Sequence, residues 1–396
     1  MWFFRSPTIV FGEDSLCHLA ELKGERAFVV ADPHIRKKGL LGPVLIQLEH
    51  AGLQTTIFDA IEPEPSIETF EEGADAMDEF APDWIVAVGG GSIIDAAKGM
   101  WALYENPDIT LSAINPIEAI RLRKKANFVA IPTTAGTGSE ATYAFVLSQP
   151  AQNGEPARKL GLGHPSLMPD IAIIDPIMTV SMPPSLTADT GMDALVQAIE
   201  GYVATWHNEF SDGLCLNAIK QIWDYLPKAY ADGNDLEARE KVANAATMAG
   251  LGYINAMVGA AHSMAHAAGA IFNLPHGRAC GLFLPYVIRF SSAANRPPDV
   301  ETRYADIVQA LGLADGAVNE TIAGQILTQN LFDLLKQLKL PHSLSATGID
   351  RATFNANLTA LIENASSDTV IFTAPRQPNE AELKQLFIDA YDGRNR

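Results

Sequence analysis

The sequence predicts a two-domain protein in which an α/β domain is followed by an all-helical domain. Its length of 396 residues fits two domains of ordinary size. In the first half, short apolar runs alternate with segments of helical spacing, whereas helical patterns dominate after Pro183-Pro184. We therefore expect an α/β domain over residues 1–183 and an all-helical domain over residues 184–396.

The α/β prediction rests on five short apolar runs that are bounded by Asp, Gly or Pro. Such runs are typical of buried parallel strands. They are Arg26–Ala31, Thr55–Phe58, Trp84–Val88, Phe128–Ile131 and Ile171–Ile174. Residues 39–51 and 67–80 have helical spacing, and the alternating pattern of residues 2–11 predicts one more strand.

The helical prediction for the second half rests on four long periodic segments. They are Asp189–Thr205, Asp212–Tyr230, Leu236–Met257 and Thr321–Leu338. Thr187 and Asp189 follow the two prolines and are residue types that cap helix N-termini. We take them as N-cap candidates for the first helix of the second domain.

The composition excludes several classes of partner. The chain has 47 acidic and 28 basic residues, for a formal net charge of -19. This balance argues against binding to nucleic acid or anionic lipid, which need clustered cations. Cys17, Cys215 and Cys280 lie far apart, so neither a disulfide framework nor a thiolate metal knuckle is indicated. The first residues lack the features of a signal peptide, and we expect a cytoplasmic protein.

Residues 242–277 contain no Asp, Glu, Lys or Arg, and this run of 36 residues is long enough to cross a membrane. The run is rich in Ala and Gly, however, and it carries several Asn and His side chains that are unfavourable in hydrocarbon. We expect a pair of buried helices beside a polar site rather than a membrane span.

A triple-glycine turn joins a predicted strand to a predicted helix in the stretch GGGSIIDAAK, which runs from Gly89 to Lys98. Glycines there let backbone N–H groups approach an anion, and the start of a helix adds a favourable dipole. An ordinary tight turn explains one glycine but rarely three followed by Ser92, so we favour a pyrophosphate-binding loop. The G-x-G-x-x-G fingerprint is absent from any strand-to-helix context, which argues against a standard Rossmann domain.

Two further features could help to hold a dinucleotide. The loop PTTAGTGSE, residues 132–140, is dense in hydroxyl groups and glycines and could wrap a ribose and a phosphate, although a plain polar loop is an equally good interpretation. Asp32 ends a predicted strand, where an acid can bond a ribose 2′-hydroxyl and repel a 2′-phosphate. A lone Asp at a strand end is otherwise a turn residue.

Three histidines, His262, His266 and His276, lie in the uncharged stretch. The first two are four residues apart and therefore share one helix face. Buried imidazoles need partners, and neutral imidazole is a common ligand of Zn²⁺ or Fe²⁺. Three together favour a metal or catalytic site over three satisfied core histidines, and Asp193 offers a carboxylate to balance the charge of an ion.

Taken in this order, these elements resemble the iron-dependent (group III) alcohol dehydrogenase family, whose fold is shared with dehydroquinate synthase and glycerol dehydrogenase. The likeness runs from Phe3 to about Phe290 and includes GGGSIIDAAK, IPTTAGTGSEAT, MPPSLTADTGMDAL and LPHGRACGLFLPYV. It implies an α/β dinucleotide-binding domain followed by an all-α domain that binds metal and substrate.

The resemblance implies that NAD(P) lies between the two domains with its pyrophosphate on the triple-glycine loop. The implied cofactor contacts are Gly90, Gly91, Ser92, Asp95, Thr133, Thr134, Thr137, Ser139 and Lys159. Asp32 matches an acidic residue that discriminates between cofactors in the family, which favours NAD(H). Glu64 departs from the Asn that many members have at this position.

The resemblance also implies a divalent metal, usually Fe²⁺ and sometimes Zn²⁺ or Mn²⁺, with one Asp and three His ligands. Asp193, His262 and His276 match three of the four. Gln197 stands where the remaining histidine is expected, and an amide oxygen is a weaker ligand than imidazole for these metals. We predict that metal binds with lowered affinity, with Gln197 or water as the fourth ligand; a site without metal in function stays an alternative.

The implied activity is the metal-dependent, NAD(H)-linked interconversion of a small primary alcohol and its aldehyde. His266 is implied to lie beside the nicotinamide and the substrate, where it helps to relay a proton. Arg278 could favour an aldehyde with a terminal anionic group, such as sulfo- or phosphonoacetaldehyde, or could be structural. The family's dimer-forming edge matches the N-terminal strand, which implies a homodimer.

Two other classes of function compete with this interpretation. A carbon–oxygen lyase or cyclase of the dehydroquinate synthase type uses the same domains, but it needs several cations to hold a polyanionic substrate, and residues 242–277 supply none. A non-catalytic NAD-binding protein with an impaired metal site is the other alternative, and Gln197 motivates it.

Overall fold

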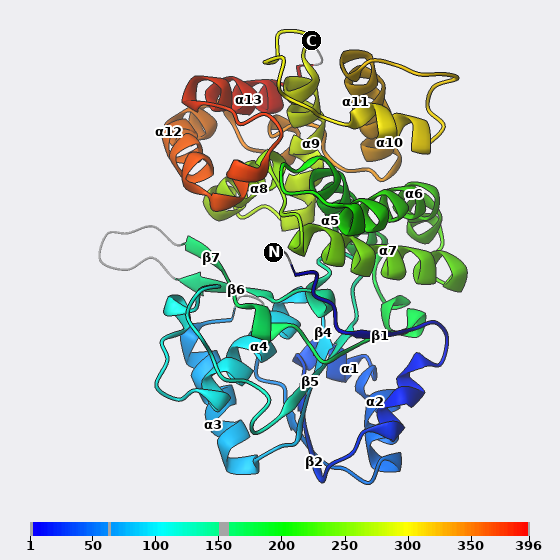
Figure 1. The fold of residues 1–396 in the computed structure, drawn as a ribbon, viewed down its shortest axis with the longest axis vertical. Coiled ribbons are helices and arrows are strands. Elements are labelled where there is room, and N and C mark those ends of the chain that lie inside the picture. The colour runs from blue at the N-terminus through cyan, green and yellow to red at the C-terminus, as the bar shows by residue number, and fades with distance from the viewer. Residues whose placement is uncertain (1–2, 62–64, 150–157, 395–396) are drawn as a thin grey trace. The chain divides into compact units, whose positions relative to one another are not determined.

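The computed structural model describes residues 3–61, 65–149 and 158–394. The chain divides into two compact units, Met1–Met182 and Pro183–Arg396, and the division falls one residue before the predicted one. The first unit is an α/β domain and the second is helical, which confirms the predicted fold class (Figure 1).

The first unit is built on a six-stranded sheet in the order β1-β8-β5-β4-β2-β3, with every neighbouring pair parallel. The strands are β1 (Thr8–Phe11), β2 (Arg26–Val30), β3 (Gln54–Phe58), β4 (Trp84–Gly89), β5 (Asn127–Pro132) and β8 (Ile171–Ile174). The five predicted apolar strands are all present, and the strand expected over residues 2–11 is shorter in the described part of the chain.

Helices cover both faces of this sheet because successive strand residues point to opposite sides. Phe28, Ile85 and Phe128 pack against α3 (Ile67–Phe80) and α4 (Gly91–Glu105). The neighbouring residues on the same strands form a second core on the other face, with α2 (Leu41–His50). The short helix α1 (Pro33–Lys37) follows β2.

An antiparallel hairpin of β6 (Ala144–Gln149) and β7 (Arg158–Gly163) was not predicted from the sequence. The strand β7 contains Arg, Lys and two glycines and so lacks the apolar composition that identifies the sheet strands, whereas β6 begins with a short apolar run that sequence reasoning missed. The hairpin follows the hydroxyl-rich loop directly and contacts α4.

The second unit consists of helices joined by loops and short 3₁₀ segments. Its helices are α5 (Pro184–Val203), α6 (Glu209–Ala231), α7 (Leu236–Ile254), α8 (Ala260–Phe272), α9 (His276–Ser292), α10 (Tyr304–Ala310), α11 (Glu320–Gln337), α12 (Arg351–Ser367) and α13 (Glu380–Asp392).

The prediction that Thr187 or Asp189 caps the first of these helices was wrong. Helix α5 begins earlier, at Pro184, and both residues are buried inside it. Proline suits the first helical position because its ring presets the backbone angle and the missing N–H would have no partner there. The side chains take other roles: Thr187 accepts a hydrogen bond from Arg239.

The uncharged stretch 242–277 forms the end of α7, all of α8 and the start of α9. Helix α8 packs against α9 and α12, and most of its residues are buried. Within the described ranges, no helix combines the length and the apolar character that a membrane crossing requires. The expectation of buried helices beside a polar site therefore directs attention to α5, α8 and α9.

Candidate cofactor loops and metal centre

Three predicted cofactor elements lie at the same edge of the sheet. Asp32 follows β2, Gly90 follows β4 and Thr133 follows β5, and these strands are neighbours in the sheet. Because the strands are parallel, their carboxyl ends meet at one edge. From β2 the chain continues to β3, its neighbour on one side, and then crosses to β4, its neighbour on the other side. The carboxyl ends of the strands at such a switch in direction are where α/β sheets bind ligands.

The triple-glycine turn and the hydroxyl-rich loop approach each other closely. A Cβ atom on Gly91 would lie 2.7 Å from a side-chain carbon of Thr137, and one on Gly90 would lie 3.3 Å from Thr134. Helix α4 begins at Gly91, and no side chain caps its start. The small residues therefore bring backbone N–H groups and threonine side chains together at the uncapped end of a helix, an arrangement suited to a phosphate.

A buried lysine holds the second loop in place. Lys98 Nζ donates to the backbone oxygens of Ser139 at 2.7 Å and Ala144 at 2.9 Å. Its neighbour Asp95 accepts from Ser139 Oγ and from the backbone of Val146. Burial lowers the pKa of Lys98 to about 8 and raises the pKa of Asp95. Asp95 and Ser139, both predicted as cofactor contacts, are thus bonded to each other and shape the loop.

The remaining cofactor candidates have different surroundings. The Asp32 carboxylate accepts a hydrogen bond of 2.7 Å from the backbone of Ile35 and so caps α1. Ser92 is exposed, and Thr133 is buried. Lys159 lies in β7, but its side chain, like residue Glu64, is outside the described part of the structure.

In the second unit, three of the four predicted metal ligands come together. Asp193 projects from α5, His262 from α8 and His276 from the start of α9. Asp193 Oδ1 lies 3.3 Å from His276 Nε2 and 3.7 Å from His262 Nε2. Asp193 and His262 are almost fully buried, whereas the His276 side chain is 43% exposed. One side of the cluster is therefore open to a small molecule.

The close packing of α9 on α5 depends on a glycine. A Cβ atom on Gly277 would lie 2.0 Å from the backbone oxygen of Asp189 and 2.9 Å from Cβ of Asp193. No side chain fits into this space. Gly277 therefore allows His276, its neighbour, to reach Asp193.

Glu200, seven residues after Asp193 on α5, orients His262. Its carboxylate accepts hydrogen bonds from the backbone of Gly259 at 2.9 Å and Ala261 at 2.7 Å, at the start of α8. It also lies 2.6 Å from His262 Nδ1. With Nδ1 as the donor to Glu200, His262 turns Nε2 toward Asp193, and Nε2 is the atom that a metal would bind.

Two buried atoms of the cluster have no hydrogen-bond partner in the described structure: Asp193 Oδ1 and His262 Nε2. Burial alone would raise the pKa of Asp193, but His276, His262 and Cys280 lower it, so the carboxylate stays ionised. An anionic oxygen and two imidazole nitrogens facing one point are a donor set that suits Fe²⁺ or Zn²⁺. The residues present fit a divalent metal.

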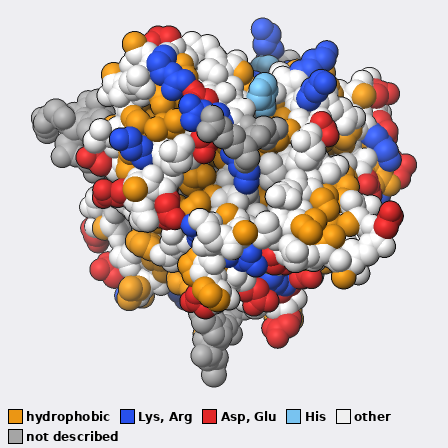
Figure 2. All heavy atoms as spheres, turned by 90° about the horizontal axis from the view of Figure 1, so that it is seen from above, with side chains coloured by type: hydrophobic (Ala, Val, Ile, Leu, Met, Phe, Trp, Pro, Cys, Tyr) orange, Lys and Arg blue, Asp and Glu red, His pale blue; other side chains and the backbone are white. Residues whose placement is uncertain are grey.

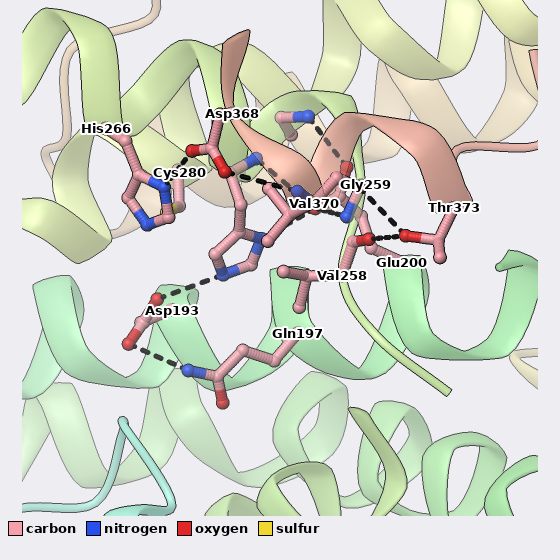
Figure 3. A network of polar contacts seen from close by, with 12 residues as sticks. Asp193, Gln197, Glu200, Val258, Gly259, His266, Cys280, Asp368, Val370 and Thr373 are labelled. Atoms are coloured by element: carbon pink, nitrogen blue, oxygen red, sulfur yellow. Dashed lines mark hydrogen bonds and ion pairs between the residues drawn. The ribbon is translucent and has the colours of Figure 1, made fainter. Parts of the chain in front are cut away.

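Gln197 lies beside Asp193, as expected for residues four apart on one helix, but its amide is turned. Its Nε2 donates to Asp193 Oδ2 at 3.1 Å. Figure 3 shows the amide oxygen pointing away from Asp193. The role of Gln197 as a metal ligand, which stays a prediction, would require this amide to turn over.

His266 lies next to the cluster and is held by a residue far along the chain. Its Nδ1 lies 2.6 Å from Asp368, at the end of α12 (Figure 3). Its ring stacks on His276 with centroids 5.3 Å apart. Burial raises the pKa of Asp368, but the contact with His266 opposes this effect, and the resulting pKa lies below the usual value of an aspartate. An ionised Asp368 fixes the His266 ring, whose side chain is 43% exposed.

Comparison with known proteins decides the family. The model described as "Iron-containing alcohol dehydrogenase" matches residues 6–176, and the one described as "Fe-containing alcohol dehydrogenase family, C-terminal" matches residues 187–391. The chain belongs to the iron-containing alcohol dehydrogenase family. The predicted resemblance is confirmed, and with it the assignment of the chain as an alcohol dehydrogenase, an enzyme that interconverts alcohols and aldehydes.

Similar members of this family cover the full chain. A protein named NADPH-dependent butanol dehydrogenase from Clostridium saccharobutylicum is 41% identical, over 99% of this chain and 98% of its own length. The structure of an iron-containing alcohol dehydrogenase from Thermococcus thioreducens is 32% identical, with a TM-score of 0.87 and full coverage of both chains. A sulfoacetaldehyde reductase from Bifidobacterium kashiwanohense, solved with NAD⁺, is 25% identical, with a TM-score of 0.85 and 98% coverage of both.

Sequence reasoning missed three residues in and around the cluster: Glu200, Asp368 and Cys280. Glu200 lies on the helix of Asp193, seven residues later, and this spacing could have indicated it. Asp368 lies 102 positions after His266, and no local pattern connects the two. Cys280 lies one helical turn after His276, in a group with Asp193, His262 and His276.

Replacing Glu200 by Gln should weaken metal binding about 10- to 100-fold, the usual effect of disturbing the partner of a metal-binding histidine. The amide has one acceptor oxygen instead of two, so it cannot serve both the N–H groups of α8 and His262 Nδ1. Competition with a chromogenic chelator measures the change in affinity. Glu209→Gln, at an exposed position on α6, is the matched control. Equal affinities in Glu200→Gln and the unaltered protein would contradict the role assigned to Glu200.

Proposed function

We propose that the protein is a metal-dependent, NAD(H)-linked dehydrogenase of small primary alcohols that also reduces the corresponding aldehydes. The observation that carries this proposal is the buried cluster in which Asp193 Oδ1 and His262 Nε2 lack hydrogen-bond partners and face His276. Family membership supports the reaction class, and the paired loops at the sheet edge support the dinucleotide.

In this proposal, Asp193, His262 and His276 hold the metal, and the partly exposed His276 marks the side from which substrate enters. When bound, the metal would supply Lewis acidity at the substrate oxygen, and the nicotinamide would carry the hydride. His266 relays the proton between substrate and solvent, because its ring stacks on His276 and is itself partly exposed. Asp368 positions His266 by accepting from Nδ1, which leaves Nε2 for the relay.

A neutral substrate fits the charges of the site better than an anionic one. Arg278 donates to both oxygens of Asp189, with Nε at 3.0 Å and Nη2 at 2.9 Å from them. Because this two-point ion pair already engages the guanidinium, it favours a structural role for Arg278 over binding of an anionic substrate. The similarity to a butanol dehydrogenase agrees with a short neutral substrate, and the similarity to a sulfoacetaldehyde reductase keeps the anionic aldehyde as the second candidate.

We propose that NAD(H) is the preferred cofactor. The carboxylate of Asp32 stands at the end of β2, next to the triple-glycine turn in the sheet order, where a ribose 2′-hydroxyl would bind. A fixed negative charge there repels a 2′-phosphate. The butanol dehydrogenase relative is named as NADPH-dependent, which makes NADP(H) the second candidate.

The face of the molecule drawn in Figure 2 gives no support to a partner or substrate that needs clustered cations. The face seen in Figure 2 mixes acidic, basic and apolar side chains instead of presenting one continuous basic surface. Arg278, the cation nearest to His276 in the sequence, is paired with Asp189. A lyase acting on a polyanionic substrate would need cations that are free to bind it.

We also propose a homodimer that forms through β1. This strand lies at the edge of the sheet, so its outer backbone groups can pair with a second copy. Phe3 and Phe11 are exposed beside it, at 70% and 63%. Apolar side chains along an open strand edge favour a protein–protein contact.

An NADH-oxidation screen tests the proposed reaction. After chelator treatment the protein should be inactive, and Fe²⁺, Zn²⁺ or Mn²⁺ should restore turnover of propanal and butanal. We expect kcat/KM for sulfoacetaldehyde to be lower than for propanal or butanal by about tenfold or more, because Asp189 engages the guanidinium of Arg278. A tenfold difference corresponds to about 1.4 kcal/mol. A metal-loaded protein that oxidises no NADH with any aldehyde would be a binding protein instead, and a preference for sulfoacetaldehyde would favour the anionic candidate.

Replacing Asp32 by Asn should raise kcat/KM for NADPH relative to NADH about tenfold or more, because the repulsion of the 2′-phosphate is lost. Initial rates with both cofactors, at a fixed aldehyde concentration, give the ratio. Asp75→Asn, an exposed acid on α3, controls for the change in net charge. If the two variants have the same ratio, Asp32 does not discriminate between the cofactors.

Sedimentation equilibrium tests the dimer. The protein should behave as a particle of twice the chain mass, and Phe11→Asp should shift it toward the monomer by placing a charge at the apolar edge. Phe372→Asp, another exposed phenylalanine, is the control and should leave the mass unchanged. A monomeric unaltered protein, or a dimer indifferent to Phe11→Asp, would contradict assembly through β1.

A further inference from the structure

We propose that the thiol of Cys280 is a fourth protein ligand of the metal, beside Asp193, His262 and His276. This assignment rests on the proposed metal site and deepens it. It gives the site a complete set of four protein donors without the histidine that Gln197 replaces.

The position of Cys280 is the first argument. It lies four residues after His276 on α9, so both side chains leave the same face of one helix. Cys280 is fully buried, and its Sγ lies 3.7 Å from His276 Nε2. One donor atom from each of the four residues lies within 4.8 Å of the other three.

The separations of the donor atoms are the second argument. Ligand atoms at about 2.0–2.3 Å from a tetrahedral metal lie about 3.3–3.8 Å from one another. Asp193 Oδ1 and His276 Nε2 are 3.3 Å apart, and Asp193 Oδ1 and His262 Nε2 are 3.7 Å apart. Cys280 Sγ lies 3.7 Å from His276 Nε2 and 3.9 Å from His276 Nδ1, so the sulfur faces the imidazole ring, and this partly exposed ring would turn to direct Nε2 at the same ion. The two separations from Asp193 Oδ1 match two edges of one tetrahedron, and all four donor atoms lie within 4.8 Å of one another.

The unpartnered buried atoms are the third argument. Asp193 Oδ1 and His262 Nε2 have no hydrogen-bond partner in the described structure, and both face the group that includes Cys280. These two atoms indicate a cation at this point, and Cys280 is the remaining side chain of the group that surrounds it. A cation bound by all four residues accounts for them and for the position of the sulfur.

Gln197 has a different task in this arrangement. Its Nε2 donates to Asp193 Oδ2, while Figure 3 shows its amide oxygen directed away from that carboxylate. The amide holds one oxygen of Asp193 and leaves Oδ1 for the metal. Gln197 is then a positioning residue, and the donor missing from α5 is supplied by α9.

The chemistry of a thiol ligand has two consequences. Binding breaks the Sγ–H bond, forms an Sγ–metal bond and releases the proton to solvent, with no change of oxidation state. A thiolate is also a softer donor than an imidazole or an amide, so it favours Zn²⁺ and Fe²⁺ over Mn²⁺. The site should therefore discriminate against Mn²⁺ more strongly than one completed by Gln197.

X-ray absorption at the zinc edge tests the assignment on the full-length, Zn²⁺-loaded protein. We expect one sulfur neighbour at about 2.3 Å, with the other neighbours at about 2.0–2.1 Å. The sulfur signal should disappear in Cys280→Ser and persist in Cys17→Ser, which alters an exposed cysteine on the other unit. The unaltered protein alone decides the question if Cys280→Ser does not fold.

The outcomes separate this proposal from the proposed function. A bound Zn²⁺ with only nitrogen and oxygen neighbours would overturn the role of Cys280 and leave the metal site intact. A protein that retains no Zn²⁺ would overturn both. As a second readout, Cys280→Ser should lower the affinity for Zn²⁺ by about 10- to 100-fold and the affinity for Mn²⁺ by less; an equal loss for both metals, or none, would contradict a thiolate ligand.

Discussion

The helical unit depends on an ionised carboxylate, Asp193, that is almost completely removed from water. Burying a single charge costs several kcal/mol unless opposite charge or hydrogen bonds compensate for it. Residues around Asp193 supply part of this compensation. Gly277 allows α9 to approach, so that His276 comes within 3.3 Å of Asp193, and Gln197 donates to its other oxygen. The divalent cation that we propose at this site would complete the compensation.

The wall around this carboxylate explains why residues 242–277 carry no formal charge. Charges inside a region of low dielectric interact strongly, so an additional Lys or Glu there would compete with the metal or with Asp193. Polar groups are admitted where they have a partner, as with Ser263, which donates to the backbone of Ala365. The stretch that raised the question of a membrane span includes the mostly buried helix α8 and the start of α9, beside a polar site.

The first unit also buries a charged side chain, in this case the cation of Lys98. Lys98 is fully buried, and it bonds to the backbone of Ser139 and Ala144 on the loop after β5. That loop meets the triple-glycine turn through Thr134 and Thr137. A buried cation therefore fixes the loop whose threonines we expect to bind the cofactor, and the phosphate itself is left to backbone N–H groups.

Much of this could be predicted from the sequence where the signal is local. The five buried strands were found because each is a short apolar run with polar boundaries, and β8 was predicted with its observed ends. The strand β7 of the hairpin lacks such a pattern, and without a recognisable partner the apolar start of β6 was not identified as a strand. His262 and His276 were found because few residue types bind metals and because both fall in an uncharged stretch, and Asp193 was found because a metal ion needs a carboxylate and because the resemblance points to it.

The partners of these residues could not be found in this way, because the contacts join distant segments. Glu200 meets His262 across 62 positions, and Asp368 meets His266 across 102. The orientation of the Gln197 amide is likewise a property of the folded site, since the sequence gives the residue and its helix face but not the direction of its oxygen. The four-residue spacing of Cys280 from His276 is visible in the sequence, but whether the two side chains lie near Asp193 depends on how α9 packs against α5.

The central claim is that one divalent ion sits at Asp193, and anomalous diffraction at the iron edge tests it most directly. Crystals grown without oxygen in the presence of Fe²⁺ should give one strong anomalous peak, at about 2.0–2.3 Å from Asp193 Oδ1, His262 Nε2 and His276 Nε2. An iron peak elsewhere, or a fully ordered Asp193 with no peak beside it, would contradict the account.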